Sequence, residues 1–212
     1  MPDYEQWLID CMKALADGGS PQDNNILTDQ KWYINKIRLY HQEDPINKLA
    51  GSVPAMNANV CTLVWEENPG QETGHFWVVI KRAAEQHFEM YDSLGRARPS
   101  NMSVAGGPKP STAVWFPFQG HLFQHPDSDT CGAWCIYSFM RYGLKDGMPK
   151  DIMPVEYSGL ENDLGKLGQM QKARAMQNEK SLFKYFLRNL VFMAPKEAPH
   201  ILHTNHVSYS CT

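Results

Sequence analysis

One cysteine of this chain lies where a protein would place a nucleophile. Cys131 follows the segment 127–130, DSDT, whose residue types all favour the first turn of a helix, and it precedes an apolar run from Ala133 to Met140. A thiol at a helix N-terminus lies at the positive end of the helix dipole and near unpaired backbone N–H groups. Both favour the thiolate, the form that attacks carbonyl carbon, and the same N–H groups stabilise an oxyanion. The sequence therefore predicts a nucleophile at the start of a buried helix.

A cysteine hydrolase also needs a base, a group that orients the base, and a donor for the oxyanion. His75 stands at the start of one expected strand, and Asp92 stands at the end of the next. An antiparallel hairpin brings those two ends to one edge of the sheet, so we expect an Asp92–His75 hydrogen bond. Gln124, ahead of the Cys131 helix, has an amide that could donate to the oxyanion. Each residue alone is more often structural or turn-forming, and the prediction rests on their combination.

The same residues resemble the pattern of the adenovirus-type (adenain) and Ulp1-like cysteine protease superfamily. The pattern is Gly74-His75, then YDSLG at 91–95, then Gln124, then DTCGAWC at 129–135. Asp92 follows His75 by 17 residues and Cys131 follows Gln124 by seven, as in the adenovirus processing protease. The resemblance covers about Val60 to Tyr142.

This resemblance implies an α+β, papain-like or Ulp1-like fold in which helices flank a central mixed sheet. It implies that Cys131 is the nucleophile, His75 the base, Asp92 its orienter and Gln124 the oxyanion donor. It further implies a viral or virus-like maturation endopeptidase that cleaves virion precursor proteins near Gly-containing sites. The alternative is a Ulp1-like isopeptidase that removes ubiquitin-like modifiers. Either enzyme would act on polypeptides inside cells, in the host nucleus or cytoplasm, or packaged in a virion.

The chain departs from the family in three ways. A Trp usually follows the catalytic His directly, whereas Phe76 here precedes Trp77. Adenovirus proteases bind an activating peptide through a disulfide, yet no cysteine lies between Asp92 and Gln124, so any activating peptide would bind without that bond. Those proteases are also basic and use DNA, whereas this chain has 20 Lys and Arg against 23 Asp and Glu. Its balance does not favour DNA binding, and we expect no cofactor.

A zinc-stabilised binding module without turnover is the rival from another class. His121, His125, Cys131 and Cys135 have acceptable zinc-ligand spacing. Cys135 also lies one helical turn after Cys131, where a small core residue is expected. The zinc interpretation leaves the His75, Asp92 and Gln124 pattern unexplained.

The remaining elements are expected to form one protease domain over residues 1–212. It divides into an N-terminal helical part (1–58), a sheet and catalytic core (59–142), C-terminal helices (143–192) and a tail (193–212). We expect helices over about 3–16, 28–40, 160–176 and 179–192, strands over 60–65, 74–80, 87–92 and 112–118, and a surface loop over 95–111.

The five scattered cysteines predict reduced thiols rather than a disulfide framework. We expect no membrane-spanning segment, because no apolar run approaches the required length, and no signal sequence, because the N-terminus MPDYEQWLID lacks a charged-then-apolar pattern.

Overall fold

The computed structural model describes residues 2–17, 31–40, 58–67, 74–85, 87–97, 114–145 and 151–189 of the 212-residue chain. Its centre is a five-stranded mixed sheet in the order β1-β2-β3-β4-β5. The strands are β1 (Trp32–Tyr40), β2 (Asn59–Glu67), β3 (Gly74–Lys81), β4 (Phe88–Tyr91) and β5 (Val114–Trp115). The pairs β1–β2 and β4–β5 are parallel, while β3 runs antiparallel to both of its neighbours. The described residues therefore form an α+β protein with a mixed sheet, as predicted.

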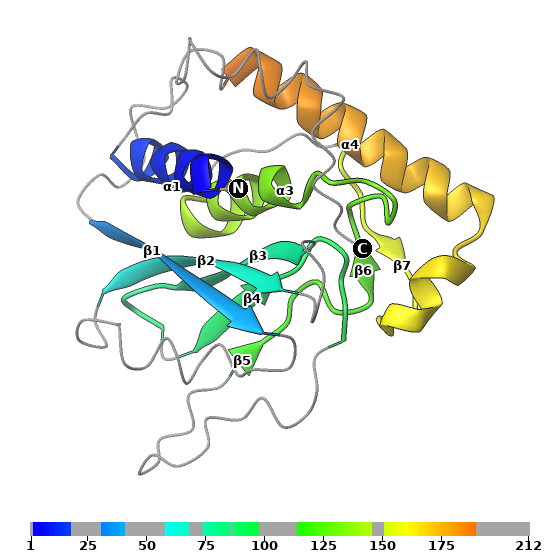
Figure 1. Ribbon diagram of the computed structural model, residues 1–212, viewed down its shortest axis with the longest axis horizontal. Helices are drawn as coiled ribbons and strands as arrows, with labels where there is room; N and C mark the ends of the chain where they lie inside the picture. Colours follow the sequence, from blue (N-terminus) through cyan, green and yellow to red (C-terminus); the bar gives the residue numbers. More distant parts are fainter. Residues whose placement is uncertain are drawn as a thin grey trace.

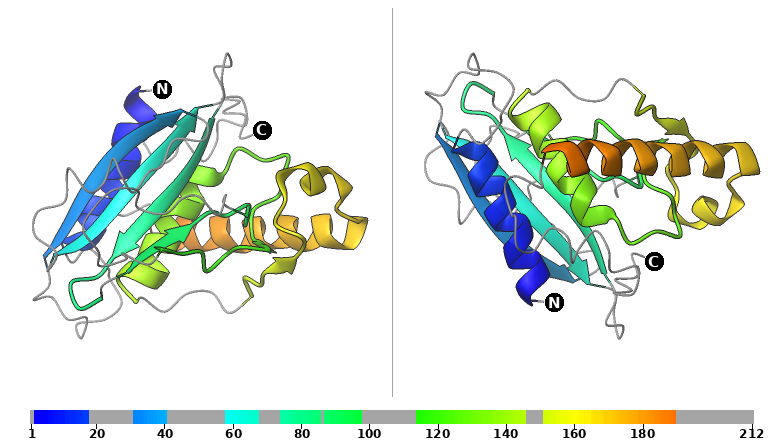
Figure 2. Two further views of the ribbon diagram at one scale, coloured as in Figure 1. Left: turned by 90° about the horizontal axis from the view of Figure 1, so that it is seen from below. Right: turned by 90° about the horizontal axis from the view of Figure 1, so that it is seen from above.

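The helices lie on one side of this sheet. Helix α1 (Pro2–Ala16) and helix α3 (Cys131–Ser138) pack against the same face, and α4 (Gln169–Asn189) lies beyond α3 (Figures 1 and 2). A π-helical turn, Phe139–Gly143, continues α3, and a 3₁₀ helix, Glu161–Lys166, precedes α4. A small second sheet pairs β6 (His121–Leu122) with β7 (Val155–Glu156) beside α4. No helix among the described residues has the length and apolarity to cross a membrane.

The central strands are buried on both faces, as their continuous apolar runs predict. Alternate residues of β3 join two different clusters. Phe76, Val78 and Ile80 pack with α1 and α3, whereas Trp77 and Val79 pack with apolar residues on the other face. Phe76 and Trp77 therefore face opposite sides of the sheet, Phe76 toward α1 and α3 and Trp77 away from them.

The predicted second helix, over residues 28–40, is wrong where the structure describes it. Residues 32–40 form β1, which pairs in parallel with β2. Its burial alternates at the end, where Ile37 and Leu39 face the sheet core while Arg38 and Tyr40 are exposed. A period of two and the abundance of Ile and Tyr favour a strand, and both signals outweigh the aromatic spacing that indicated a helix.

Boundaries also differ in the C-terminal half. The two helices expected over 160–176 and 179–192 are a short 3₁₀ helix followed by one helix, α4, without a break between 176 and 179. The strand expected over 112–118 is only Val114–Trp115 as far as the structure describes it. Most of the expected loop (98–111) and the tail (193–212) lie outside the described residues.

Candidate active site

The site begins at the edge of the sheet where β3 starts and β4 ends. His75 is the second residue of β3, and Asp92 directly follows β4. The structure brings them together, with His75 Nε2 2.7 Å from Asp92 Oδ1. The backbone N–H of Leu94 donates to the same carboxylate oxygen at 3.0 Å. Both side chains are almost completely buried, so this hydrogen bond is shielded from water.

The Asp92 contact determines the protonation pattern of the imidazole. A carboxylate only accepts, so Nε2 of His75 carries the hydrogen that it donates to Asp92. In neutral His75 the other nitrogen, Nδ1, then has a free lone pair, and this buried atom has no hydrogen-bond partner among the described residues. Burial lowers the pKa of His75, and the negative charge of Asp92 opposes that shift. His75 therefore offers an uncharged base at Nδ1.

Cys131 is the first residue of α3, as its sequence context predicts. The carbonyl of Thr130 accepts the first helical hydrogen bond, from Trp134 N at 3.2 Å, although the Thr130 side chain makes no capping bond. Helix α3 packs against β3, and the buried Cys131 shares an apolar cluster with Phe76, the residue after His75.

The redox state of Cys131 differs from the sequence prediction. Cys11, Cys61 and Cys135 are free thiols, as predicted, whereas Cys131 is disulfide-bonded. A sulfur in a disulfide has no lone thiolate with which to attack a carbonyl. Chemistry at Cys131 therefore requires its reduction.

Gly132 allows α1 to fix the start of α3. A Cβ at this position would overlap Tyr4 Oη and lie 2.9 Å from Leu8 Cδ1, so a larger residue would force these two side chains of α1 to shift. The Tyr4 ring also packs edge-on against Phe76, with 6.0 Å between centroids. Helix α1 thus connects the first turn of α3 to the first residues of β3.

Gln124 is completely buried, and both ends of its amide are engaged. Its Oε1 accepts from Ser93 Oγ at 2.6 Å, and its Nε2 donates to Ser128 O at 2.8 Å. The amide nitrogen carries two hydrogens, so one remains for another acceptor. Since Ser93 follows Asp92, Gln124 is joined to the turn that also holds the carboxylate.

Two charged residues that the sequence analysis did not identify complete the buried network. Arg96 Nε donates to Asp92 Oδ2 at 2.8 Å, and Arg96 Nη2 donates to Glu66 Oε2 at 2.9 Å. The indole of Trp77 donates to the same Glu66 oxygen at 3.1 Å. Trp77 therefore has a defined role on the far face of the sheet, while Phe76 faces α3. The one sequence signal for Arg96 is its position four residues after Asp92, across a turn.

Helix α4 holds the loop between Gln124 and Cys131. Oε1 of Glu179 accepts from His125 N at 2.9 Å and from Thr130 Oγ1 at 2.9 Å, and it also accepts from the hydroxyl of Ser128. This carboxylate is buried and comes from a helix 49 residues beyond Thr130. No local pattern predicts the contact.

The residues of the zinc interpretation are not brought together. His121, His125, Cys131 and Cys135 form no group of three or more with ligand atoms within 4.8 Å of one another. His121 instead bonds the carbonyl of Gln119, and burial raises the pKa of the Cys135 thiol well above its ordinary value. Cys135 is therefore a buried core residue, as its spacing from Cys131 suggested.

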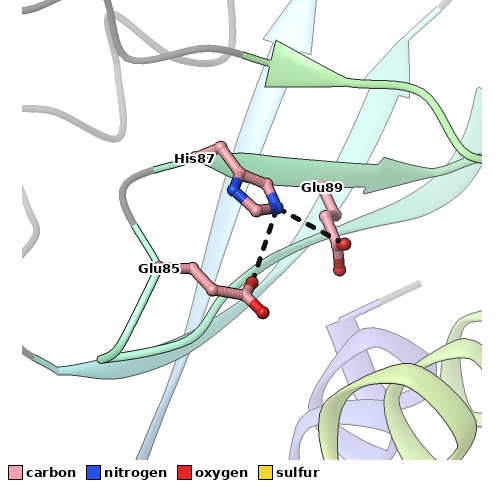
Figure 3. A group of neighbouring side chains, drawn as sticks. All are labelled: Glu85, His87 and Glu89. Atoms are coloured by element: carbon pink, nitrogen blue, oxygen red, sulfur yellow. Dashed lines mark ion pairs between the residues drawn. The ribbon is translucent and has the colours of Figure 1, made fainter.

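Glu85, His87 and Glu89 are the one group of possible metal ligands found among the described residues. Figure 3 shows Nε2 of His87 between the two carboxylates, 3.5 Å from each. Arg82 already pairs with Glu85 at 2.6 Å and with Glu89 at 2.9 Å. This cluster is best described as an ion-pair network that stabilises the β3–β4 hairpin.

No protein-family model and no curated protein matches this chain. Two solved structures align with it at low TM-scores. ChlaDub1 from Chlamydia trachomatis aligns with a TM-score of 0.33 and 15% identity over 82% of this chain and 79% of that one. The Legionella pneumophila effector protein RavZ aligns with a TM-score of 0.29 and 12% identity over 82% of this chain and 66% of that one. At these TM-scores neither likeness bears on activity, for which only the site geometry is informative.

Proposed function

We propose that this protein is a cysteine peptidase of papain-like or Ulp1-like architecture, with Cys131 as nucleophile. The observation that carries the proposal is the buried His75–Asp92 hydrogen bond, which leaves His75 Nδ1 as a free base. After reduction, His75 takes the proton of the Cys131 thiol at Nδ1, and the thiolate attacks the scissile carbonyl carbon. The imidazolium then gives that proton to the leaving amine, and water hydrolyses the thioester. Asp92 holds the imidazole in the required tautomer throughout.

The oxyanion formed in each step needs donors that are already in place. Gln124 offers the one amide hydrogen that Ser128 does not use. The first backbone N–H groups of α3, which have no partner within the helix, are the second source. The N–H groups of α3 adjoin Cys131 in the chain. The Gln124 amide is bound to the carbonyl of Ser128, three residues before the nucleophile.

For the substrate, we propose virion precursor proteins cut near Gly-containing sites, in infected host cells. This finer proposal rests on the family resemblance of residues 60–142. The alternative function, which uses the same chemistry, is an isopeptidase that removes ubiquitin-like modifiers. Short Gly-containing peptides and a ubiquitin-like modifier with a C-terminal fluorophore distinguish them, because a deconjugase requires the folded modifier.

The test begins with the full chain reduced by a phosphine. Iodoacetamide labelling at mildly acidic pH, followed by intact mass and site mapping, should modify Cys131 much faster than the other cysteines, because only an activated thiol is ionised there. His75→Ala should remove that fast phase. Hydrolysis of the two substrate classes is then measured with and without reductant, and it should require reductant.

Cys131→Ala and Cys135→Ala form a matched pair on the same helix. Cys131→Ala should abolish hydrolysis, whereas Cys135→Ala should retain most of it. Uniformly slow labelling of all cysteines in the reduced protein, or fast labelling at Cys135, would rule out the proposed nucleophile.

A further inference from the structure

A buried guanidinium lies next to the His75–Asp92 pair and contacts three carboxylates, two of them buried and the third, Glu161, exposed and 3.6 Å away. Arg96 is 8% exposed and spans Asp92 Oδ2 through Nε and Glu66 Oε2 through Nη2. Glu66 and Asp92 are equally buried, at 6% and 5%. Burying a charge is costly unless it is paired, so this arrangement is stable only as a connected unit.

The unit restricts how the Asp92 carboxylate can turn. Oδ1 receives His75 Nε2 and the N–H of Leu94, while Oδ2 receives Arg96. With both oxygens occupied by donors from different directions, rotation of the carboxylate would break at least one bond. The planar fork of Arg96 suits this task, because its orientation is fixed by its bond to Glu66.

Glu66 occupies its place because of the sheet register. It lies directly opposite His75 in the β2–β3 ladder, and the indole of Trp77 donates to it from the same face of β3. The charged groups that act on His75 are therefore Asp92 and Arg96 after β4 and Glu66 on β2. Cys131 on α3 becomes a further ionisable neighbour once it is reduced.

We propose that Arg96 is a positioning residue for the proposed peptidase: it presents Asp92 Oδ1 to His75, and Glu66 holds Arg96 in that position. The inference rests on the proposed function for its catalytic meaning, although its geometry stands without it. Arg96 has two consequences for His75. It orients the acceptor that fixes the Nε2–H tautomer, and its positive charge disfavours the imidazolium. Glu66 offsets the second consequence.

The direct readout is the pKa of His75, measured by NMR titration of its imidazole nitrogens. The full chain with Cys131→Ala serves as the background, since it lacks both the nucleophile and the disulfide. Arg96→Gln should raise the pKa of His75, because it removes a nearby positive charge. Glu66→Gln should lower the pKa of His75, because it removes a negative one. A residue with a merely structural role would not produce opposite shifts from the two partners.

Arg82→Gln is the matched control. Arg82 also bridges two glutamates, Glu85 and Glu89, but it is not among the main influences on the pKa of His75. It should leave the pKa of His75 unchanged. Equal His75 pKa values in the Arg96→Gln and Arg82→Gln proteins would overturn the inference. Near-ultraviolet circular dichroism would show whether Arg96→Gln folds. If it does not fold, Glu66→Gln becomes the test, and a His75 pKa that is not lowered in that variant would also overturn the inference.

The kinetic readout separates this inference from the proposed function. In the reduced chain with Cys131 intact, Arg96→Gln should slow alkylation of Cys131, by about 10- to 100-fold if it matters as much as the partners that orient metal-binding histidines. If the unsubstituted chain shows no fast alkylation, the proposed function fails, while the NMR comparison still tests Arg96. If the unsubstituted chain reacts fast and Arg96→Gln reacts equally fast, the inference alone fails.

Discussion

Ser93 Oγ donates a 2.6 Å hydrogen bond to Gln124 Oε1, and this contact determines which end of the Gln124 amide is available. With Oε1 held by Ser93, Nε2 points to the carbonyl of Ser128 and retains one hydrogen. The residue after Asp92 thus orients the proposed oxyanion donor. A single turn at the end of β4 therefore serves both the imidazole and the amide.

The first prediction concerns Gln124. Gln124→Ala should lower kcat/KM for hydrolysis by about 10²- to 10³-fold, the usual effect of removing one oxyanion donor. Ser93→Ala should lower it by a smaller factor, because the amide remains but is less well oriented. Neither change should slow iodoacetamide labelling of Cys131, since alkylation forms no oxyanion. A parallel fall of both rates in Gln124→Ala would mean that the residue only supports the fold.

The parts of the site that were predictable depend on local sequence. His75 and Asp92 terminate two strands joined by a short connection, so their meeting follows from antiparallel pairing within one hairpin. Cys131 follows a run of residues that favour helix starts, and α3 begins there. The first relationship depends on one hairpin that spans 17 residues, and the second depends on the residues directly before Cys131.

The parts that were missed depend on long-range contacts. Glu66 reaches Arg96 from β2, and Glu179 reaches the Cys131 loop from α4, and neither contact has a sequence period or spacing that indicates it. The strand β1 was predicted as a helix because the spacing of its aromatic residues suits a helix, and its parallel pairing with β2 is a non-local contact that local sequence does not reveal. The disulfide at Cys131 likewise could not be read from five unevenly spaced cysteines.

A second prediction concerns Asp92→Asn. The sequence alone suggests lower turnover with little effect on folding, but the structure changes the second expectation. Asn removes one counter-charge of buried Arg96, which keeps its pair with Glu66, so the loss should be at most about 3–5 kcal/mol, the cost of leaving a buried charge unpaired. Urea denaturation should show this loss in the free energy of unfolding. Asp127→Asn, whose side chain is 74% exposed, is the control and should change stability little.

A third prediction concerns the pH dependence of stability. Burial lowers the pKa of His75 below its ordinary value of 6.5, so the unfolded chain binds this proton more tightly than the folded one. The stability contributed by neutral His75 is therefore fully present above the ordinary value and is lost as the pH falls through it toward the lowered pKa. Urea unfolding between about pH 5 and pH 7 should show this loss. His75→Gln should flatten the slope, and an unchanged slope would show that other groups cause it.

The last prediction concerns the connection between α4 and the nucleophile. Glu179 Oε1 accepts hydrogen bonds from His125 N, Thr130 Oγ1 and the Ser128 hydroxyl, so one carboxylate of α4 holds three residues of the loop before Cys131. Glu179→Ala leaves buried donors without their acceptor, a cost of about 1–3 kcal/mol for each group that stays unpaired. We therefore expect a lower melting temperature.

We also expect slower hydrolysis in Glu179→Ala at temperatures where the protein remains folded, because Ser128 O and the start of α3 would no longer be fixed. Lys180→Ala, on the next residue of the same helix and exposed, is the matched control and should leave both quantities unchanged. Glu179→Gln keeps an acceptor oxygen, so its melting temperature and hydrolysis rate should lie between those of Glu179→Ala and Lys180→Ala. A variant that melts early but hydrolyses substrate at the full rate while folded would show that α4 stabilises the loop without positioning Cys131.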